Sequence, residues 1–287
     1  MAILGMKGKV FHIAITGSAV LILLLAAGIL YILVSEALPA FRHFGFFRFI
    51  ATDAWNPSEE QYGAFAFIVG TFSTALLALA ISFPLSLSVS LFSCELCKER
   101  MVASFLRSIM NFLARVPSII YGVWGFYFLR SLFIQKGIGN YGLGILTASC
   151  VLAIMILPYT VSLLNAAFDK TPFRLKEMAY SLGANPLDVI SKVSLPLVKN
   201  EIIVAYLLSL VRVMGETIIV TILIGNTYQM PTGITQSGNT MSSILINQIG
   251  AFALLKASSL IAIALLLFGL TAILNVVSKY LLRRIPV

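Results

Sequence analysis

Charged residues and chemically reactive side chains are scarce in this sequence. Only 11% of the 287 residues are charged, against roughly a quarter in an ordinary soluble domain. There are two histidines and three cysteines, and the chain contains neither an HExxH-type metal motif nor a set of nucleophile, base and orienting residue. We therefore predict a protein with no catalytic site, no metal and no cofactor.

The three cysteines form no metal or disulfide framework. Cys94 and Cys97 make a lone CxxC, without the second pair of ligands that a zinc site requires. We interpret both as free thiols. Cys150 lies inside an apolar run and is interpreted as a packing residue.

A phosphate-binding loop for ATP is also absent. No stretch matches G-x-x-x-x-G-K-[ST], the loop whose backbone amides hold nucleotide phosphates. The chain therefore cannot hydrolyse ATP by that route. Any ATP-driven work in which it takes part requires another polypeptide.

Long apolar runs dominate what is present, since 59% of the residues are hydrophobic. A membrane-spanning helix needs about 20 apolar residues. Four charge-free runs reach that length, and two more do so apart from Arg115 in one and Arg212 and Glu216 in the other. Continuous runs, rather than ten-residue alternation, argue against barrel strands. The sequence thus predicts an all-α polytopic membrane protein with six transmembrane helices, within residues 10–34, 64–94, 108–129, 140–168, 202–225 and 257–278.

Lysine and arginine are unevenly distributed among the connections, which sets the expected orientation. With the N-terminus inside, the cytoplasmic segments hold thirteen of them: Lys7, Lys9, Lys98, Arg100, Arg107, Lys170, Arg174, Lys176, Lys192, Lys199, Lys279, Arg283 and Arg284. The outer segments hold four: Arg42, Arg48, Arg130 and Lys136. Both termini are therefore predicted to be cytoplasmic. The net charge of +9 reflects this topology, and we expect no nucleic-acid partner.

We divide the chain into two parts at residue 63. Residues 1–63 contain the first transmembrane helix and an outer loop, and residues 64–287 contain the other five helices. The outer connection at 226–250 carries no charge and is rich in Gly, Thr, Ser and Asn. Two interpretations stay open for it, a re-entrant or gate-lining segment and a plain flexible connector.

The longest cytoplasmic connection predicts two short amphipathic helices. Thr171 and Pro172 form an N-cap and N1 pair, and Gly183 supplies a stop about three turns later. Asn185 and Pro186 then begin the second helix. Such paired caps indicate a loop that holds a fixed shape, and its apolar face is expected to contact a partner.

This connection resembles the EAA loop of ABC importer permeases, E-A-A-x3-G-x9-I-x-L-P. The residues of the pattern are Glu177, Ala179, Gly183, Leu195 and Pro196, with Ala184 beside the glycine. Met178 and Val193 replace one apolar residue by another, and Pro196 is also expected to end the second helix. The resemblance implies that residues 165–200 form a coupling helix, which docks into a cleft of a cytoplasmic ATP-binding subunit and bends at the glycine.

Three further stretches resemble the PstC family of phosphate permeases within that group. They are AWNPSEEQYGAFAFIVGT at 54–71, ARVPSIIYGVWGFYFL at 114–129 and RVMGETIIVTILIGN at 212–226. The resemblance implies a permease subunit of an ATP-driven phosphate importer in the bacterial inner membrane. Its implied partners are a PstA-like permease, two copies of the ATP-binding subunit, an external phosphate-binding protein and the lipid bilayer.

The third stretch places charges in a run that is otherwise apolar. Each charge at mid-bilayer costs on the order of 3 kcal/mol. Arg212 and Glu216 stand at i and i+4, so we expect them to share one face of the fifth helix and to be able to pair. The PstC resemblance implies that both, with Thr217, lie on the substrate pathway. A salt bridge that only locks helices together is the structural alternative.

Arg115 is expected to extend to the lipid head groups, the alternative being a second cation on the pathway.

Other functions stay open beside phosphate import. A permease for another oxyanion, such as sulfate or molybdate, shares the EAA loop. A stand-alone ion-coupled transporter or an intramembrane enzyme is disfavoured, because inverted-repeat halves and a catalytic set are both missing.

Overall fold

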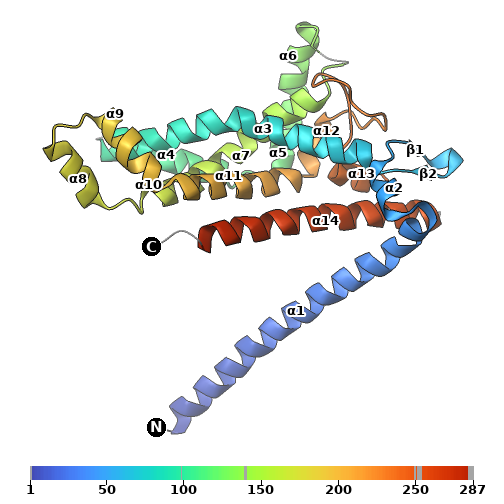
Figure 1. Cartoon of the computed structure of the whole chain (residues 1–287), viewed down its shortest axis with the longest axis horizontal. Coiled ribbons are helices and arrows are strands. Elements are labelled where there is room, and N and C mark those ends of the chain that lie inside the picture. Colours follow the sequence, from blue (N-terminus) through green and yellow to red (C-terminus); the bar gives the residue numbers. More distant parts are fainter. Residues whose placement is uncertain (1, 98, 139–140, 249, 251–253, 284–287) are drawn as a thin grey trace.

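A computed structural model describes residues 2–97, 99–138, 141–248, 250 and 254–283. Helices make up most of the described chain (Figure 1), so the all-α prediction is confirmed. The four longest helices are α1 (Ala2–Phe44), α3 (Phe65–Leu91), α7 (Ile145–Phe168) and α14 (Leu254–Arg283). They cover most of each of the four charge-free runs.

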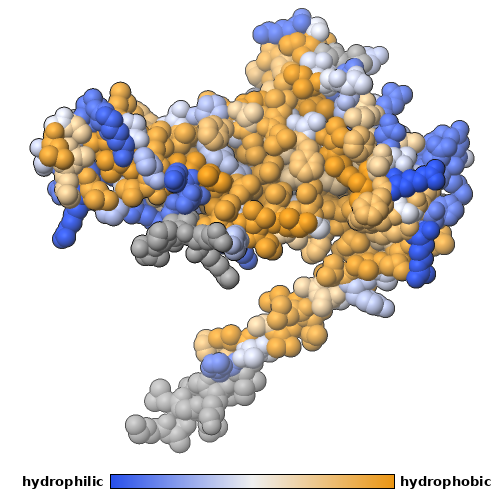
Figure 2. All heavy atoms as spheres, in the orientation of Figure 1, coloured by the Kyte–Doolittle hydropathy of each residue, from blue (hydrophilic) through white to orange (hydrophobic). Residues whose placement is uncertain are grey.

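These helices make the chain a multi-pass membrane protein. Among the described residues, four helices are long and apolar enough to cross a membrane, and a bent pair allows a fifth crossing. Apolar atoms cover the middle of the visible face, while hydrophilic atoms gather towards both ends (Figure 2). The start of α1 and the end of α14 point towards the end that carries α8 (Phe173–Ser181), as Figure 1 shows. The six-helix count and the cytoplasmic termini remain predictions.

The third predicted span, over residues 108–129, is a helix that is broken by a sharp bend. It consists of α4 (Arg100–Leu113), α5 (Ser118–Trp124), the π-helical η3 (Gly125–Leu129) and α6 (Arg130–Gln135). The segments on either side of the break are bent by 89°. Pro117 stands at the break, where it lacks a backbone donor and disfavours the helical conformation of the residue before it.

The fifth predicted span is also interrupted. It consists of α11 (Lys199–Met214) and α12 (Ile218–Leu223), separated at residues 215–217. Gly215, the weakest helix former in this stretch, stands directly after α11. The two charged residues of the motif therefore do not share one continuous helix.

The core forms where α3, α7, α11 and α12 meet. Buried glycines allow the closest approaches. A Cβ on Gly70 would lie 2.0 Å from the Asn239 carbonyl oxygen, and one on Gly122 would lie 2.9 Å from Ile222 of α12. Ser149 of α7 donates a hydrogen bond to the Thr74 carbonyl of α3 at 3.1 Å. These contacts hold the helices that carry the charged motif in a fixed arrangement.

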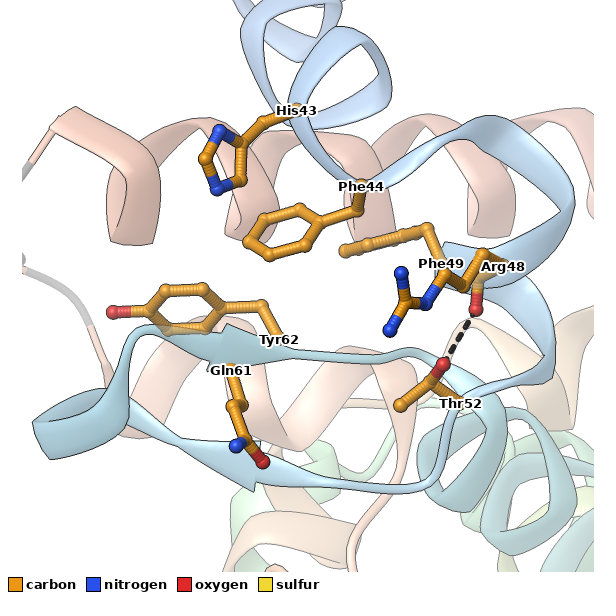
Figure 3. A pocket seen from close by; sticks show the side chains of 7 residues that line it. All are labelled: His43, Phe44, Arg48, Phe49, Thr52, Gln61 and Tyr62. Carbon is orange, nitrogen blue, oxygen red and sulfur yellow. Dashed lines mark hydrogen bonds between the residues drawn. The ribbon is translucent and has the colours of Figure 1, made fainter.

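The outer loop between α1 and α3 contains a small hairpin that the sequence did not predict. The loop comprises α2 (Phe46–Ala51), β1 (Trp55–Asn56), the 3-10 helix η1 (Pro57–Glu59) and β2 (Gln61–Tyr62). Trp55 pairs with Tyr62 in the antiparallel register, and its ring packs edge-on against Phe67 of α3. A pocket of about 370 Å³ lies between this hairpin and the end of α1, with His43 and Arg48 in its wall (Figure 3).

Residues 238–244 of the connection at 226–250 are packed into the protein, so the interpretation of the whole connection as a plain flexible segment is wrong. It contains α13 (Met241–Asn247), whose first residues are buried. The backbone amide of Met241 donates to Thr71 of α3 at 2.9 Å. The Ile145 amide, at the start of α7, donates to the Gln236 carbonyl at 3.1 Å.

Candidate functional site

A cavity of about 310 Å³ opens where the two helix breaks face α7. The α4–α5 break contributes Ser118, α7 contributes Tyr159, and the α11–α12 region contributes Arg212 and Glu216. Two of the three stretches that resemble phosphate permeases therefore meet at one cavity. Arg115 does not line it and is exposed beside it.

Arg212 is held over an aromatic ring. Its guanidinium carbon lies 4.8 Å from the centre of the Tyr159 ring, within the range of a cation–π contact. This contact holds the guanidinium beside the ring, and its N–H donors make no hydrogen bond to the other described residues, so they are available to a ligand. Tyr159 was not predicted from the sequence, although a tyrosine after Pro158 inside an apolar run was a usable signal.

The predicted ion pair between Arg212 and Glu216 does not form. Neither residue is in a salt bridge within the described part of the chain. The physical reason is the end of α11 at Met214, which removes the helical spacing on which the prediction relied. The guanidinium and the carboxylate thus line the same cavity as separate charges.

Backbone contacts fix the two breaks that shape this cavity. The Tyr121 hydroxyl donates to the Leu113 carbonyl across the α4–α5 break at 2.9 Å. Ser242 of α13 donates to the Glu216 carbonyl at 2.8 Å. Thr217 lies just before α12, and its hydroxyl donates to the Gly215 carbonyl at 3.2 Å. Thr217 does not line the cavity.

The connection that is predicted to be cytoplasmic has the expected stop at Gly183, which has φ +83°. The Gly183 amide donates to the Tyr180 carbonyl at 3.0 Å, and the Ala184 amide donates to the Ala179 carbonyl at 3.1 Å. These two bonds define a Schellman motif. The N-cap prediction was wrong by one position, because Pro172 caps α8 without a side-chain bond and α8 begins at Phe173.

The second helix begins as predicted but ends later. The Asn185 side chain accepts a hydrogen bond from the Asp188 amide at 2.8 Å, with Pro186 at the first helical position. The helix runs through α9 (Pro186–Val189), the π-helical η4 (Ile190–Ser194) and α10 (Leu195–Leu197). The prediction that Pro196 ends it was therefore wrong by one residue. Lys192, 2.6 Å from Asp188, lowers the pKa of that carboxyl by donating a hydrogen bond to it.

This coupling loop, defined here as residues 169–198, exposes apolar side chains at its tip. Leu182 is 88% exposed, and Phe173, Met178 and Leu187 are exposed as well. Apolar residues clustered on a protruding loop are typical of a docking surface. A buried ion pair, between Lys176 of α8 and Glu95 at 2.8 Å, ties the loop to the π-helical turn η2 (Phe92–Leu96) that continues α3.

Comparison with known proteins identifies the family. Residues 88–287, well over half of the chain, match the model for the binding-protein-dependent transport system inner membrane component. The chain belongs to this family. This permease subunit is therefore a transport component of the ABC importer type and not an enzyme.

The curated relatives cover almost the whole permease subunit. It is 34% identical to the phosphate transport system permease protein PstC of Mesorhizobium japonicum, across 96% of this chain and 90% of the relative. It is also 34% identical to the protein of the same name from Pasteurella multocida, across 93% and 89%. Among solved structures, a chain of the inward-facing MetNI methionine ABC transporter is 18% identical, with a TM-score of 0.57 over 77% of this chain and 94% of that chain. That likeness shows a shared fold.

Proposed function

We propose that this chain is the permease subunit of an ATP-driven phosphate importer in the bacterial inner membrane. The observation that carries the proposal is the cavity in which Arg212 and Glu216 stand as separate charges. The PstC names of the relatives support phosphate as the substrate. Its partners are a PstA-like permease, two ATP-binding subunits and an external phosphate-binding protein. ATP-dependent uptake of labelled phosphate by the reconstituted complex tests this, and uptake by the chain alone would contradict it.

The two charges divide binding and release between them. The Arg212 guanidinium, held beside the Tyr159 ring, has two parallel N–H donors for an oxyanion, which is the geometry of a bidentate contact. The Glu216 carboxylate competes for the same donors. A translocation path must bind the transported anion weakly enough to release it. Competition from Glu216 lowers the affinity of Arg212 for the anion.

The carboxylate also favours phosphate over sulfate. An unpaired carboxylate accepts hydrogen bonds only. Phosphate keeps at least one proton at neutral pH and donates it to Glu216, whereas sulfate has no proton to donate and is repelled. The same side chain that weakens binding in general therefore weakens sulfate binding more.

Glu216→Gln is expected to remove this discrimination. Phenylglyoxal modifies arginine, and an anion bound to Arg212 should protect it. In the parental complex, the phosphate concentration needed for protection should be about tenfold lower than the sulfate concentration, because phosphate makes one additional charge-assisted hydrogen bond. In the variant the two anions should differ by less than about twofold. Mass spectrometry of the Arg212 peptide measures the protection. Glu59→Gln, in the outer loop, is the matched control, and equal protection by both anions in the parental complex would contradict the idea.

The coupling loop is proposed to dock into the ATP-binding subunit, with Glu177, Leu195 and Pro196 as positions of the family motif. Gly183→Val is expected to weaken co-purification of that subunit. A β-branched residue is strained at φ +83°, so the bend between α8 and α9 must open. No atom lies within 4 Å of a Cβ at this position, and a fold defect from steric overlap is therefore not expected. Unchanged co-purification and unchanged ATPase stimulation would show that the loop docks elsewhere.

A further inference from the structure

A second cavity, of about 210 Å³, lies between α4 and α7. Arg107 and Asn111 of α4 line it, together with Ser162 and Asn165 of α7 and Asp169 directly after α7. It therefore contains a cation, a carboxylate and three neutral polar groups. From the sequence, Arg107 contributes only to the predicted topology.

The second cavity follows the first along the same two helices. Met155 and Tyr159 line the first cavity, and Ser162, Ala166 and Asp169 line the second. Their spacings of four, three, four and three residues place them on one face of α7. The helical rise puts Ala166 roughly 10 Å beyond Tyr159 towards the coupling loop. The two cavities thus lie in sequence along one helix face.

The polar groups of the second cavity are oriented by their neighbours. The Asn165 side-chain oxygen accepts from Ser90 at 2.7 Å and from Cys94 at 3.3 Å. The Asn165 amide nitrogen, in a residue that is only 9% exposed, has no partner among the described residues. A fixed oxygen and an unpartnered N–H2 group next to a cavity leave a donor for a ligand that accepts hydrogen bonds.

Arg107 is held in place by neighbouring side chains and can still bind an anion. Its Nη2 atom lies 3.2 Å from Asp169 and 3.4 Å from the Cys94 sulfur. The pair with Asp169 is half-exposed, and such pairs contribute little to stability. The cation and its carboxylate repeat the combination of Arg212 and Glu216 in the first cavity.

We propose that the second cavity is a further oxyanion site on the transport route, between the Arg212 cavity and the cytoplasm. The proposal rests on the proposed function, because it takes transported phosphate as the ligand. The anion leaves Arg212 and is bound by the Arg107 guanidinium, the Asn165 amide and the Ser162 hydroxyl. Asp169 competes for Arg107 and so permits release.

Asn165→Asp tests the site with little change in shape. The carboxylate keeps the oxygen that Ser90 and Cys94 use, removes the amide donor and adds a negative charge beside Arg107. A purely structural role predicts a stronger ion pair and unchanged transport, whereas the anion site predicts a fall in phosphate uptake of at least about tenfold. The control is Asn200→Asp, an exposed position at the start of α11. Parental uptake by Asn165→Asp would overturn the proposal.

Alkylation of Cys94 by N-ethylmaleimide provides a readout that does not depend on transport. An anion bound to Arg107 neutralises the positive charge that stabilises the Cys94 thiolate. Alkylation should then slow, because the thiolate is the reactive form of cysteine. Millimolar inorganic phosphate should slow modification of the Cys94 peptide at least about fivefold relative to chloride at equal ionic strength. If phosphate does not slow alkylation of Cys94 in the assembled parental complex, the proposed site is overturned. This measurement is independent of the Asn165→Asp variant, so it decides the question even if that variant fails to assemble.

Two additional measurements distinguish the second cavity from the Arg212 cavity and from a lipid site. In the Arg212→Gln complex, phosphate should still protect Cys94 from the cytoplasmic side, so loss of the proposed function and loss of the second site are distinguished. The complex is also placed in nanodiscs of phosphatidylcholine with and without phosphatidylglycerol. Protection by phosphatidylglycerol without free phosphate would assign the cavity to a lipid head group and overturn the transport site.

Discussion

Phosphate uptake is expected to be lost when Arg212 is replaced by glutamine, while the complex still assembles and inserts. The substitution replaces the charged fork by a neutral amide, so the bidentate, charge-assisted contact with the anion is lost. A hydrogen bond to a charged group contributes about 1.5–3 kcal/mol, so losing a bidentate pair reduces binding at this step by roughly a hundredfold or more. Uptake of labelled phosphate into proteoliposomes that contain the full complex measures the effect.

Arg115→Gln is the matched control for this experiment. Arg115 carries the same charge close to the same cavity, and it is exposed like Arg212, but it does not line the cavity. Its replacement should leave uptake within about twofold of the parental rate. Arg212→Lys should be intermediate, because lysine keeps the charge and loses the planar fork. Equal uptake by the parental and Arg212→Gln complexes would remove Arg212 from the pathway.

Reversing Glu95 to lysine is expected to uncouple ATP hydrolysis from uptake. Glu95 pairs with Lys176 at 2.8 Å, and their side chains are 4% and 16% exposed. Removing one partner of a buried pair costs about 3–5 kcal/mol. The pair joins the coupling loop to η2, which continues α3. Tyr206 of α11 donates a hydrogen bond to the Phe83 carbonyl of α3 at 3.0 Å, so α3 is connected in turn to the helix that carries Arg212. We expect ATPase activity to persist while uptake falls at least about tenfold.

The double variant Glu95→Lys with Lys176→Glu decides whether the pair itself is responsible. It restores opposite charges at the same two positions, so uptake should recover substantially. Glu99→Lys, exposed four residues further along, makes the same charge change without breaking a buried pair and should be tolerated. A double variant as defective as the single one would show that the ion pair does not transmit the motion.

Local chemistry explains the parts of the fold that the sequence predicts. A charge-free run of twenty apolar residues in lipid satisfies its backbone only as a helix, so the runs within α1, α3, α7 and α14 could be located from composition. The Schellman stop at Gly183 and the cap at Asn185 depend on adjacent residues alone. The Thr171 prediction missed by one position because Pro172 itself can occupy the cap.

Long-range contacts decide the features that the sequence does not predict. The breaks after α4 and α11 are held by Tyr121 and Ser242, which donate to the Leu113 and Glu216 carbonyls. The Leu113 carbonyl can accept this bond because Pro117, four residues on, has no N–H to donate to it. Arg212 and Glu216 could be selected from the motif, but their separation could not, because it follows from the second break. The role proposed for Asn165 could not be predicted from the sequence for a similar reason. Its free amide follows from hydrogen bonds that come from α3 and η2, more than seventy residues away.

The hydrogen bond from Ser242 to the Glu216 carbonyl connects α13 to a residue whose side chain lines the Arg212 cavity. Because that bond is 2.8 Å long, a shift of α13 by more than about an ångström must either break it or move the Glu216 backbone as well. We therefore expect a movement of α13 to change the position of Glu216 relative to Arg212, and with it the affinity that we propose for the anion.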